Sequence, residues 1–97
     1  MTTYGYVQDK DALIKRLHRI EGQVRGIERM VAEERYCIDI LTQISAATTA
    51  LDTLALRLLE GHVNTCVAHA LASGDEDAAA AKSKELIDAV ERFARAR

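Results

Sequence analysis

The sequence predicts an all-α protein built from three helices. Apolar residues recur at spacings of three and four, no proline occurs in the 97 residues, and only 4% of the residues are aromatic. The spacing places apolar side chains on one face of an α-helix, and proline would interrupt such a helix. The length predicts one small domain, residues 1–97, and a domain of this size buries little surface by itself. We therefore expect partner subunits.

The first helix is expected to follow residues 1–7, which show no periodicity and are expected to be flexible. Asp9 or Asp11 suits its N-cap, because a carboxylate accepts hydrogen bonds from the free N–H groups of a first turn. Gly22 and Gly26 lie one turn apart inside this helix, where another helix can approach closely. Its apolar face carries Leu13, Leu17, Ile20, Val24, Ile27 and Val31.

A second helix is expected from about residue 36 to residue 72, after a break at residues 32–35 that contains neither Gly nor Pro. At about 1.5 Å per residue it would exceed roughly 50 Å, so partner helices must cover it. Its near-heptad stripe includes Cys37, Leu41, Ile44, Thr48, Leu51, Ala55, Leu58, His62 and Cys66.

A third, shorter helix is expected after residue 75. Gly74 is a suitable C-cap for the preceding helix, and the acidic residues 75–77 offer an N-cap for the next one. The apolar stripe of this third helix consists of Leu86, Ile87, Val90 and Phe93.

Two cysteines and one histidine share a face of the second helix. His62 and Cys66 are one turn apart, which suits metal ligation. At about 100° per residue, Cys37 lies within roughly 20° of both. Yet Cys37 is about 37 Å from His62 along the axis. An antiparallel pairing about a two-fold axis near Ala50 and Leu51 would bring Cys37 of one chain to His62 and Cys66 of another.

Two thiolates and one imidazole favour a soft ion such as Cu(I) or Zn(II). Structural zinc sites usually have a fourth ligand, so three ligands favour Cu(I). The N–H on the imidazole nitrogen that does not bind the metal needs an acceptor, for which Glu85 is a candidate, and Tyr36 beside Cys37 is a candidate for the same surroundings. The alternative is that the cysteines are small buried core residues. The shared face favours the ligand set.

Charge is distributed unevenly, although the net charge is only −2. Residues 10–29 are rich in Lys and Arg, whereas Arg57 is the only Lys or Arg in residues 36–77. The bases Lys15, Arg16, Arg19 and Arg25 are candidates for contacts with DNA phosphates. On composition alone, an ordinary solvated basic stripe is the favoured interpretation of these residues. No apolar stretch is long enough to cross a bilayer and no signal peptide is visible, so we expect a cytoplasmic protein with reduced cysteines.

Several segments carry a family resemblance. Residues 16–27, RLHRIEGQVRGI, resemble the first helix of the CsoR/RcnR family of metal-responsive repressors. Residues 36–46, YCIDILTQISA, and residues 62–66, HVNTC, are similar to its second and third signatures. With residues 85–88, ELID, the resemblance covers nearly the whole chain.

The resemblance implies a four-helix-bundle dimer that assembles into a dimer-of-dimers tetramer. It implies Cu(I) held between subunits by Cys37, His62 and Cys66, with Tyr36 and Glu85 matching residues around the ligands. It further implies that the metal-free protein binds operator DNA and that Cu(I) releases it, which derepresses copper-resistance genes.

The same resemblance defines alternatives. Nickel and cobalt sensors replace the last Cys with His, and persulfide sensors keep both cysteines but lose the His. A thiol-sensing repressor that uses Cys37 and Cys66 remains open, as does a copper buffer without a DNA role. One departure is Thr53, where some copper sensors carry arginine. An enzyme is not expected, because the ligand set offers no obvious catalytic base.

Overall fold

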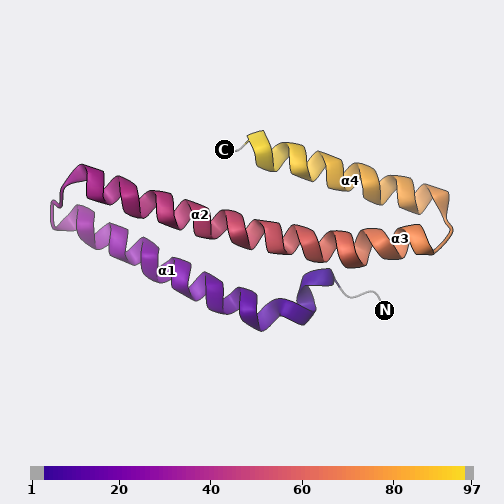
Figure 1. Ribbon diagram of the computed structural model, residues 1–97, viewed down its shortest axis with the longest axis horizontal. Coiled ribbons are helices and arrows are strands. Elements are labelled where there is room, and N and C mark those ends of the chain that lie inside the picture. The colour runs from indigo at the N-terminus through magenta and orange to yellow at the C-terminus, as the bar shows by residue number, and fades with distance from the viewer. Residues whose placement is uncertain (1–3, 96–97) are drawn as a thin grey trace. The chain divides into compact units, whose positions relative to one another are not determined.

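Every secondary-structure element that the computed structural model describes, within residues 4–95, is helical (Figure 1). The elements in order are the 3-10 helix η1 (Gly5–Asp9), α1 (Lys10–Ala32), α2 (Cys37–Gly61), the π-helix η2 (His62–Val67), α3 (Ala68–Ala72) and α4 (Glu76–Arg95). Because α2, η2 and α3 follow one another without interruption, they correspond to the predicted second helix. The prediction of an all-α chain with three helices is confirmed.

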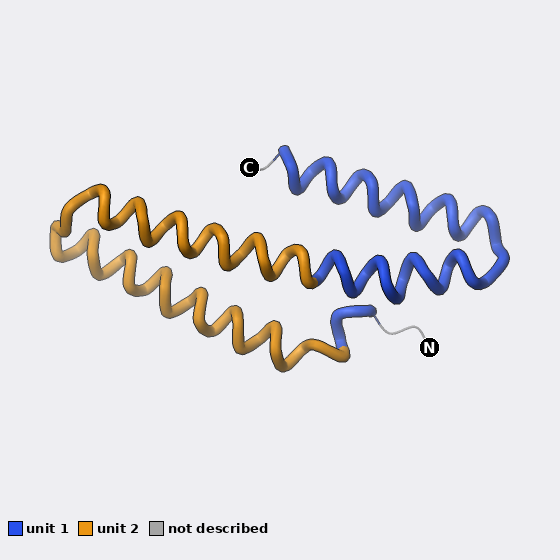
Figure 2. Tube along the Cα trace, in the orientation of Figure 1, with its two compact units in different colours: residues 1–7, 58–97 blue, residues 8–57 orange. Residues whose placement is uncertain are grey.

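The described chain divides into two compact units (Figure 2). One unit contains residues 8–57, which are α1 and most of α2; the other contains the described residues before 8 and after 57. That residues 1–97 act as one domain stays a prediction.

In the unit of residues 8–57, α1 and α2 form a helical hairpin that buries Leu13, Ile20, Ala47 and Leu54. Asp9 directly precedes α1, but its side chain makes no capping hydrogen bond, so this part of the N-cap prediction is wrong. Its Oδ2 lies instead 3.6 Å from Arg57 Nη1. Because η1 runs directly into α1, the first turn of α1 is not a free helix end that needs a side-chain cap.

The break after α1 is a helix-ending turn without glycine. The N–H of Glu34 donates to the Val31 carbonyl at 3.1 Å, and the N–H of Arg35 donates to the Met30 carbonyl at 3.0 Å. These two bonds define a Schellman motif, in which the residue after the C-cap adopts a left-handed conformation. Glu34 occupies that position with a φ of 55°. The predicted break at residues 32–35 is confirmed.

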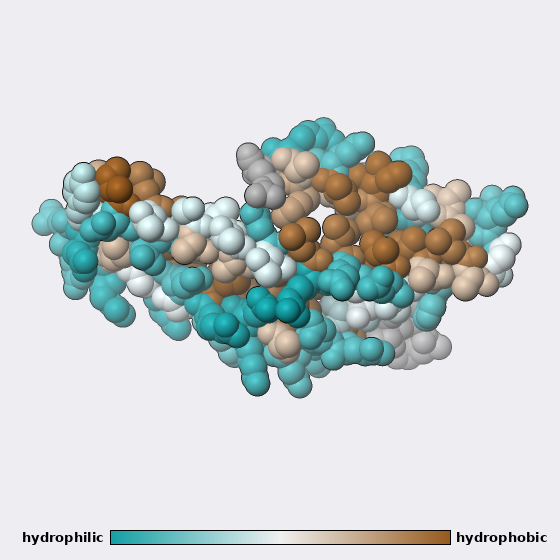
Figure 3. All heavy atoms as spheres, in the orientation of Figure 1, coloured by the Kyte–Doolittle hydropathy of each residue, from teal (hydrophilic) through white to brown (hydrophobic). Residues whose placement is uncertain are grey.

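The turn before α4 is also as predicted. Gly74 has a φ of 76°, and its N–H donates to the Leu71 carbonyl at 3.5 Å. Asp75 Oδ1 accepts from the backbone N–H groups of Asp77 at 3.0 Å and Ala78 at 3.1 Å, so Asp75 caps α4. α4 packs against η2 and α3 within one unit, where apolar side chains gather (Figure 3).

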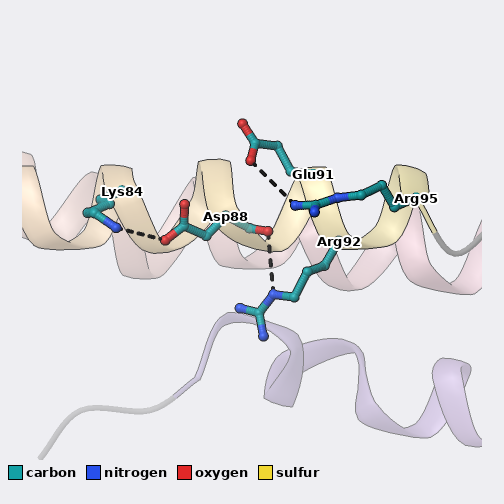
Figure 4. Close-up of polar contacts among 5 residues, drawn as sticks. All are labelled: Lys84, Asp88, Glu91, Arg92 and Arg95. Carbon is teal, nitrogen blue, oxygen red and sulfur yellow. Dashed lines mark hydrogen bonds and ion pairs between the residues drawn. The ribbon is translucent and has the colours of Figure 1, made fainter.

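The solvent face of α4 carries pairs of opposite charge (Figure 4). Lys84 Nζ lies 3.1 Å from Asp88 Oδ2, and Arg95 Nη2 lies 3.8 Å from Glu91 Oε2. Arg92 Nε also donates to the Asp88 backbone carbonyl at 3.5 Å. Such exposed pairs each contribute little to stability, and they mark this face as solvated.

Part of the segment that was expected to be flexible is helical. Gly5 to Val7 belong to η1, whereas residues 1–3 lie outside the described residues. Gly5 lies so close to Gly61 that a Cβ at residue 5 would overlap the Gly61 carbonyl oxygen. The flexibility of residues 1–7 stays a prediction.

Large apolar side chains remain exposed in the single chain. On α2, the exposed fractions are 57% for Leu41, 42% for Ile44 and 47% for Leu51, all of which belong to the predicted stripe. Among the described residues of the residue 8–57 unit, a Cβ at Gly22 or Gly26 has no neighbour within 4 Å, so no other helix of that unit approaches these glycines closely. Among the helices described, none has the length and hydropathy to cross a membrane.

Candidate metal centre

His62 and Cys66 lie in η2, the π-helical segment His62–Val67. A π-helix bonds residues i and i+5, so its turn is wider than that of an α-helix. Residues four apart therefore come closer to one full turn than in α-helix, which brings the His62 and Cys66 side chains more nearly into line. The prediction treated this stretch as uniform α-helix, and that part is wrong.

Glu85 of α4 faces His62 within the same unit. His62 Nε2 lies 3.6 Å from Glu85 Oε1, beyond the 2.7–3.2 Å of a hydrogen bond but within ion-pair range. The His62 side chain is 28% exposed and the Glu85 side chain 56% exposed. The structure thus brings together the predicted ligand His62 and its predicted acceptor.

The same oxygen of Glu85 has a second neighbour. Lys82 Nζ lies 3.7 Å from Glu85 Oε1, with the Lys82 side chain 43% exposed. Lys82 and Glu85 are three residues apart on α4, so their side chains project from the same helix face. Lys82 is not among the residues predicted from sequence, although its i, i+3 spacing from Glu85 on the predicted third helix indicates that they share a face.

Cys37 and Tyr36 lie at the start of α2, in the other unit. Cys37 is the first residue of α2 and its thiol is free and exposed, whereas Cys66 is free and partly buried. The Tyr36 carbonyl accepts from the N–H groups of Asp39 and Ile40, at 3.1 and 3.2 Å, which fixes the first turn around Cys37. The Tyr36 side chain is 66% exposed.

Within the described part of one chain, no three His, Cys, Asp or Glu side chains converge where they could hold a metal ion. The three predicted ligands are thus divided: His62 and Cys66 share η2, and Cys37 belongs to the residue 8–57 unit. Their joint role as ligands stays a prediction.

The predicted basic residues all lie on α1. Lys15, Arg19 and Arg25 are exposed, and Arg16 is partly buried. Arg16 and Arg19 line a shallow concavity of about 120 Å³, together with Ile20, Gln23 and Ala50. Gln23 is not among the predicted residues, and it lies one turn after Arg19 on this face.

Comparison with known proteins defines the class. The family model described as metal-sensitive transcriptional repressor matches residues 9–92. The chain belongs to this family of metal-sensitive transcriptional repressors, which are regulators rather than enzymes, in agreement with the sequence analysis.

Individual relatives are close. The chain is 59% identical over 71 residues to the copper-sensing transcriptional repressor RicR of Mycobacterium tuberculosis, covering 73% of this chain and 74% of RicR. It is 51% identical over 86 residues to the copper-sensing transcriptional repressor CsoR of Bacillus subtilis, covering 89% and 82% of the two chains.

Two solved structures share the fold. The copper-sensing repressor CsoR with Cu(I) from Geobacillus thermodenitrificans matches with a TM-score of 0.83 and 46% identity, covering 91% of this chain and 88% of that one. The nickel-responsive transcriptional regulator InrS matches with a TM-score of 0.72 and 38% identity, covering 91% and 96%.

Proposed function

We propose that this protein is a Cu(I)-responsive transcriptional repressor: its metal-free form binds operator DNA in the cytoplasm, and Cu(I) releases it and derepresses copper-resistance genes. The observation that carries the proposal is the donor set. Cys37, His62 and Cys66 are present in a metal-sensitive repressor that is 51% identical over 86 residues to a copper-sensing one.

The donor chemistry of the three residues fits copper. Thiolates prefer soft ions, and three ligands without a fourth suit Cu(I) better than structural zinc. Both cysteines are free thiols in the structure, and His62 lies on the same turn as Cys66. When bound, the ion would join two helices through these three side chains.

The approach of His62 to Glu85 supports Nδ1 as the imidazole nitrogen that would bind the metal. Nε2 is the atom that approaches Glu85. With its proton on Nε2 and directed at the carboxylate, the imidazole offers Nδ1 to the metal. Glu85 would then orient the ring, while Tyr36 would lie beside the thiolate of Cys37.

The proposed site lies between two chains. The exposed stripe of α2 that includes Cys37, Leu41, Ile44 and Leu51 supports this, since a stable α2 needs another helix on that face. A second copy arranged antiparallel supplies that helix and makes two equivalent sites. We propose a four-helix-bundle dimer of this kind, and a tetramer of two such dimers.

DNA binding is assigned to the basic face of α1. Lys15, Arg16, Arg19 and Arg25 can neutralise backbone phosphates, and a tetramer presents several such faces at once. Copper and DNA must then favour different conformations. A coupling free energy of about 1–3 kcal/mol changes DNA affinity about 5- to 150-fold.

The test is an anaerobic titration of labelled DNA from the protein's own promoter, read by fluorescence anisotropy. We expect tight binding by the metal-free protein and release by about one equivalent of Cu(I) per chain, but not by a persulfide donor. Release by the persulfide donor alone would show a thiol sensor instead. Cu(I) binding without any DNA binding would show a copper buffer.

A further inference from the structure

We propose that Lys82 competes with His62 for the carboxylate of Glu85 and thereby weakens the copper site; this inference rests on the function proposed above. One oxygen atom carries the argument. Glu85 Oε1 lies 3.6 Å from His62 Nε2 and 3.7 Å from Lys82 Nζ. Both distances are longer than a hydrogen bond, so the oxygen is within ion-pair range of two donors and hydrogen-bonded to neither.

The two donors differ in strength. Both bonds are charge-assisted, because the acceptor is the Glu85 carboxylate, but only the Lys82 ammonium adds a full positive charge and its Coulomb attraction. A metal-bound His62 is a neutral imidazole with one N–H to donate. Where both donors can reach the same oxygen, Lys82 therefore competes effectively with the imidazole.

Two consequences of this arrangement act in the same direction. A carboxylate that accepts from the distal imidazole nitrogen raises the basicity of the ligating nitrogen, so sharing Glu85 with Lys82 lowers it. The ammonium also places a positive charge close to a site that must take a cation. Both effects weaken metal binding, and removal of the Lys82 charge should strengthen it.

Lys82 is partly exposed, which makes it suitable for substitution. Lys82 lies on α4, three residues before Glu85, and α4 packs against the η2 segment that carries His62. Its side chain is 43% exposed, so a polar replacement leaves no buried cavity. Lys84 offers a matched control, since it is on the same helix but pairs with Asp88 at 3.1 Å.

The first measurement uses Cu(I) competition titrations on the full-length protein. Lys82→Gln should bind Cu(I) about two- to fivefold more tightly than wild type. We expect a change of this size because exposed ion pairs contribute little free energy. Lys82→Arg, which keeps the charge, and Lys84→Gln, which removes a charge elsewhere on α4, should each match wild type. Unchanged or weaker binding by Lys82→Gln, or equal gains in Lys84→Gln, would overturn the proposal.

A double mutant separates the shared oxygen from a general charge effect. In a Glu85→Gln background, Lys82→Gln should lose most of its effect, because no carboxylate remains to be shared. If the increase in Cu(I) affinity persisted fully in that background, Lys82 would act only through the electrostatic effect of its charge, and the proposal would be wrong.

A second measurement does not depend on copper. The imidazole ¹⁵N shifts of His62 in the metal-free protein report how strongly Nε2–H is bonded. Lys82→Gln should move them towards a more strongly bonded Nε2–H, and Lys84→Gln should leave them in place. Shifts unaffected by Lys82→Gln would overturn the proposal. If the protein failed to bind Cu(I) while these shifts moved as expected, the proposed function would be at fault rather than the shared carboxylate.

Discussion

His62 Nε2 and Glu85 Oε1 lie 3.6 Å apart, although one side chain comes from η2 and the other from α4. The pair joins the segment that carries two candidate ligands to the last helix of the chain. A small shortening would convert it into a hydrogen bond of 2.7–3.2 Å. If His62 binds the metal as proposed, this pair would link the metal site to α4.

Replacement of Glu85 should separate metal binding from DNA release. In Glu85→Ala the imidazole of His62 can still bind the metal. We therefore expect Cu(I) affinity to fall only about 10–100-fold. Because the link to α4 is removed, copper should lower DNA affinity less than in wild type. DNA titrations with and without saturating Cu(I) measure this coupling. Complete release of DNA by copper-loaded Glu85→Ala would show that the pair carries none of it.

A mixing experiment tests whether the ligands come from two chains. Cys37→Ser and the double variant His62→Ala, Cys66→Ser should each bind Cu(I) poorly. Unfolded together and refolded, they form mixed dimers in which one site has all three native ligands. We expect about one tight Cu(I) per mixed dimer, measured by competition with a chelator. A site confined to one chain would give no recovery.

Helix ends were predictable wherever a residue type determines the local backbone. Gly74 and Asp75 are residue types that favour a helix C-terminus and an N-cap respectively, and both occupy the predicted positions. Glu34 has no such signature, because its left-handed conformation is imposed by the Schellman bonds around it. The position of the break could therefore be predicted from sequence, but the backbone conformation of the turn could not.

Sequence suffices to name candidate site residues, whose joint role as ligands stays a prediction, but it did not give their local geometry. Apolar spacing cannot distinguish i+4 from i+5 bonding over six residues, so the π-helical segment His62–Val67 was missed. The approach of Glu85 to His62 was anticipated from the need of an imidazole for an acceptor. The role proposed for Lys82 depends on the position of one Glu85 oxygen near two side chains, which no sequence pattern determines.

Glu34→Gly should stabilise the protein. Glu34 has a φ of 55°, a conformation that costs a residue with a Cβ about 1–2 kcal/mol, whereas glycine adopts it freely. After allowance for the greater flexibility of unfolded glycine, we expect a gain of about 0.5–1 kcal/mol per chain. Urea unfolding at fixed protein concentration measures it. Glu33→Gly is the control, because Glu33 has a φ of −87° and should gain nothing.

Gly74→Ala should have the opposite effect. Apart from its chain neighbours, no described residue lies within 4 Å of a Cβ placed at Gly74, so the penalty comes from the backbone φ of 76°. We expect a loss of about 1 kcal/mol in the free energy of unfolding. Asn tolerates the left-handed region better than Ala, so Gly74→Asn should lose less. Equal losses in both variants would point to a cause other than backbone conformation.

Arg19→Ala should weaken DNA binding and reduce its dependence on salt. Arg19 is exposed on α1 and lines the concavity formed with Arg16, Gln23 and Ala50. If Arg19 neutralises one phosphate, its removal should lower the slope of log affinity against log salt by about 0.9. Alanine is a strong helix former, so α1 should remain intact. Anisotropy titrations across a range of salt concentrations give both quantities.

Lys84→Ala is the matched control for Arg19→Ala, since it also removes one exposed positive charge, but from α4. If DNA binds the basic face of α1, Lys84→Ala should keep the wild-type slope and Cu(I) should still release the DNA. Equal changes in the two variants would indicate that net charge alone governs affinity. A loss of affinity confined to Lys84→Ala would place the DNA on α4 and contradict the assignment to α1.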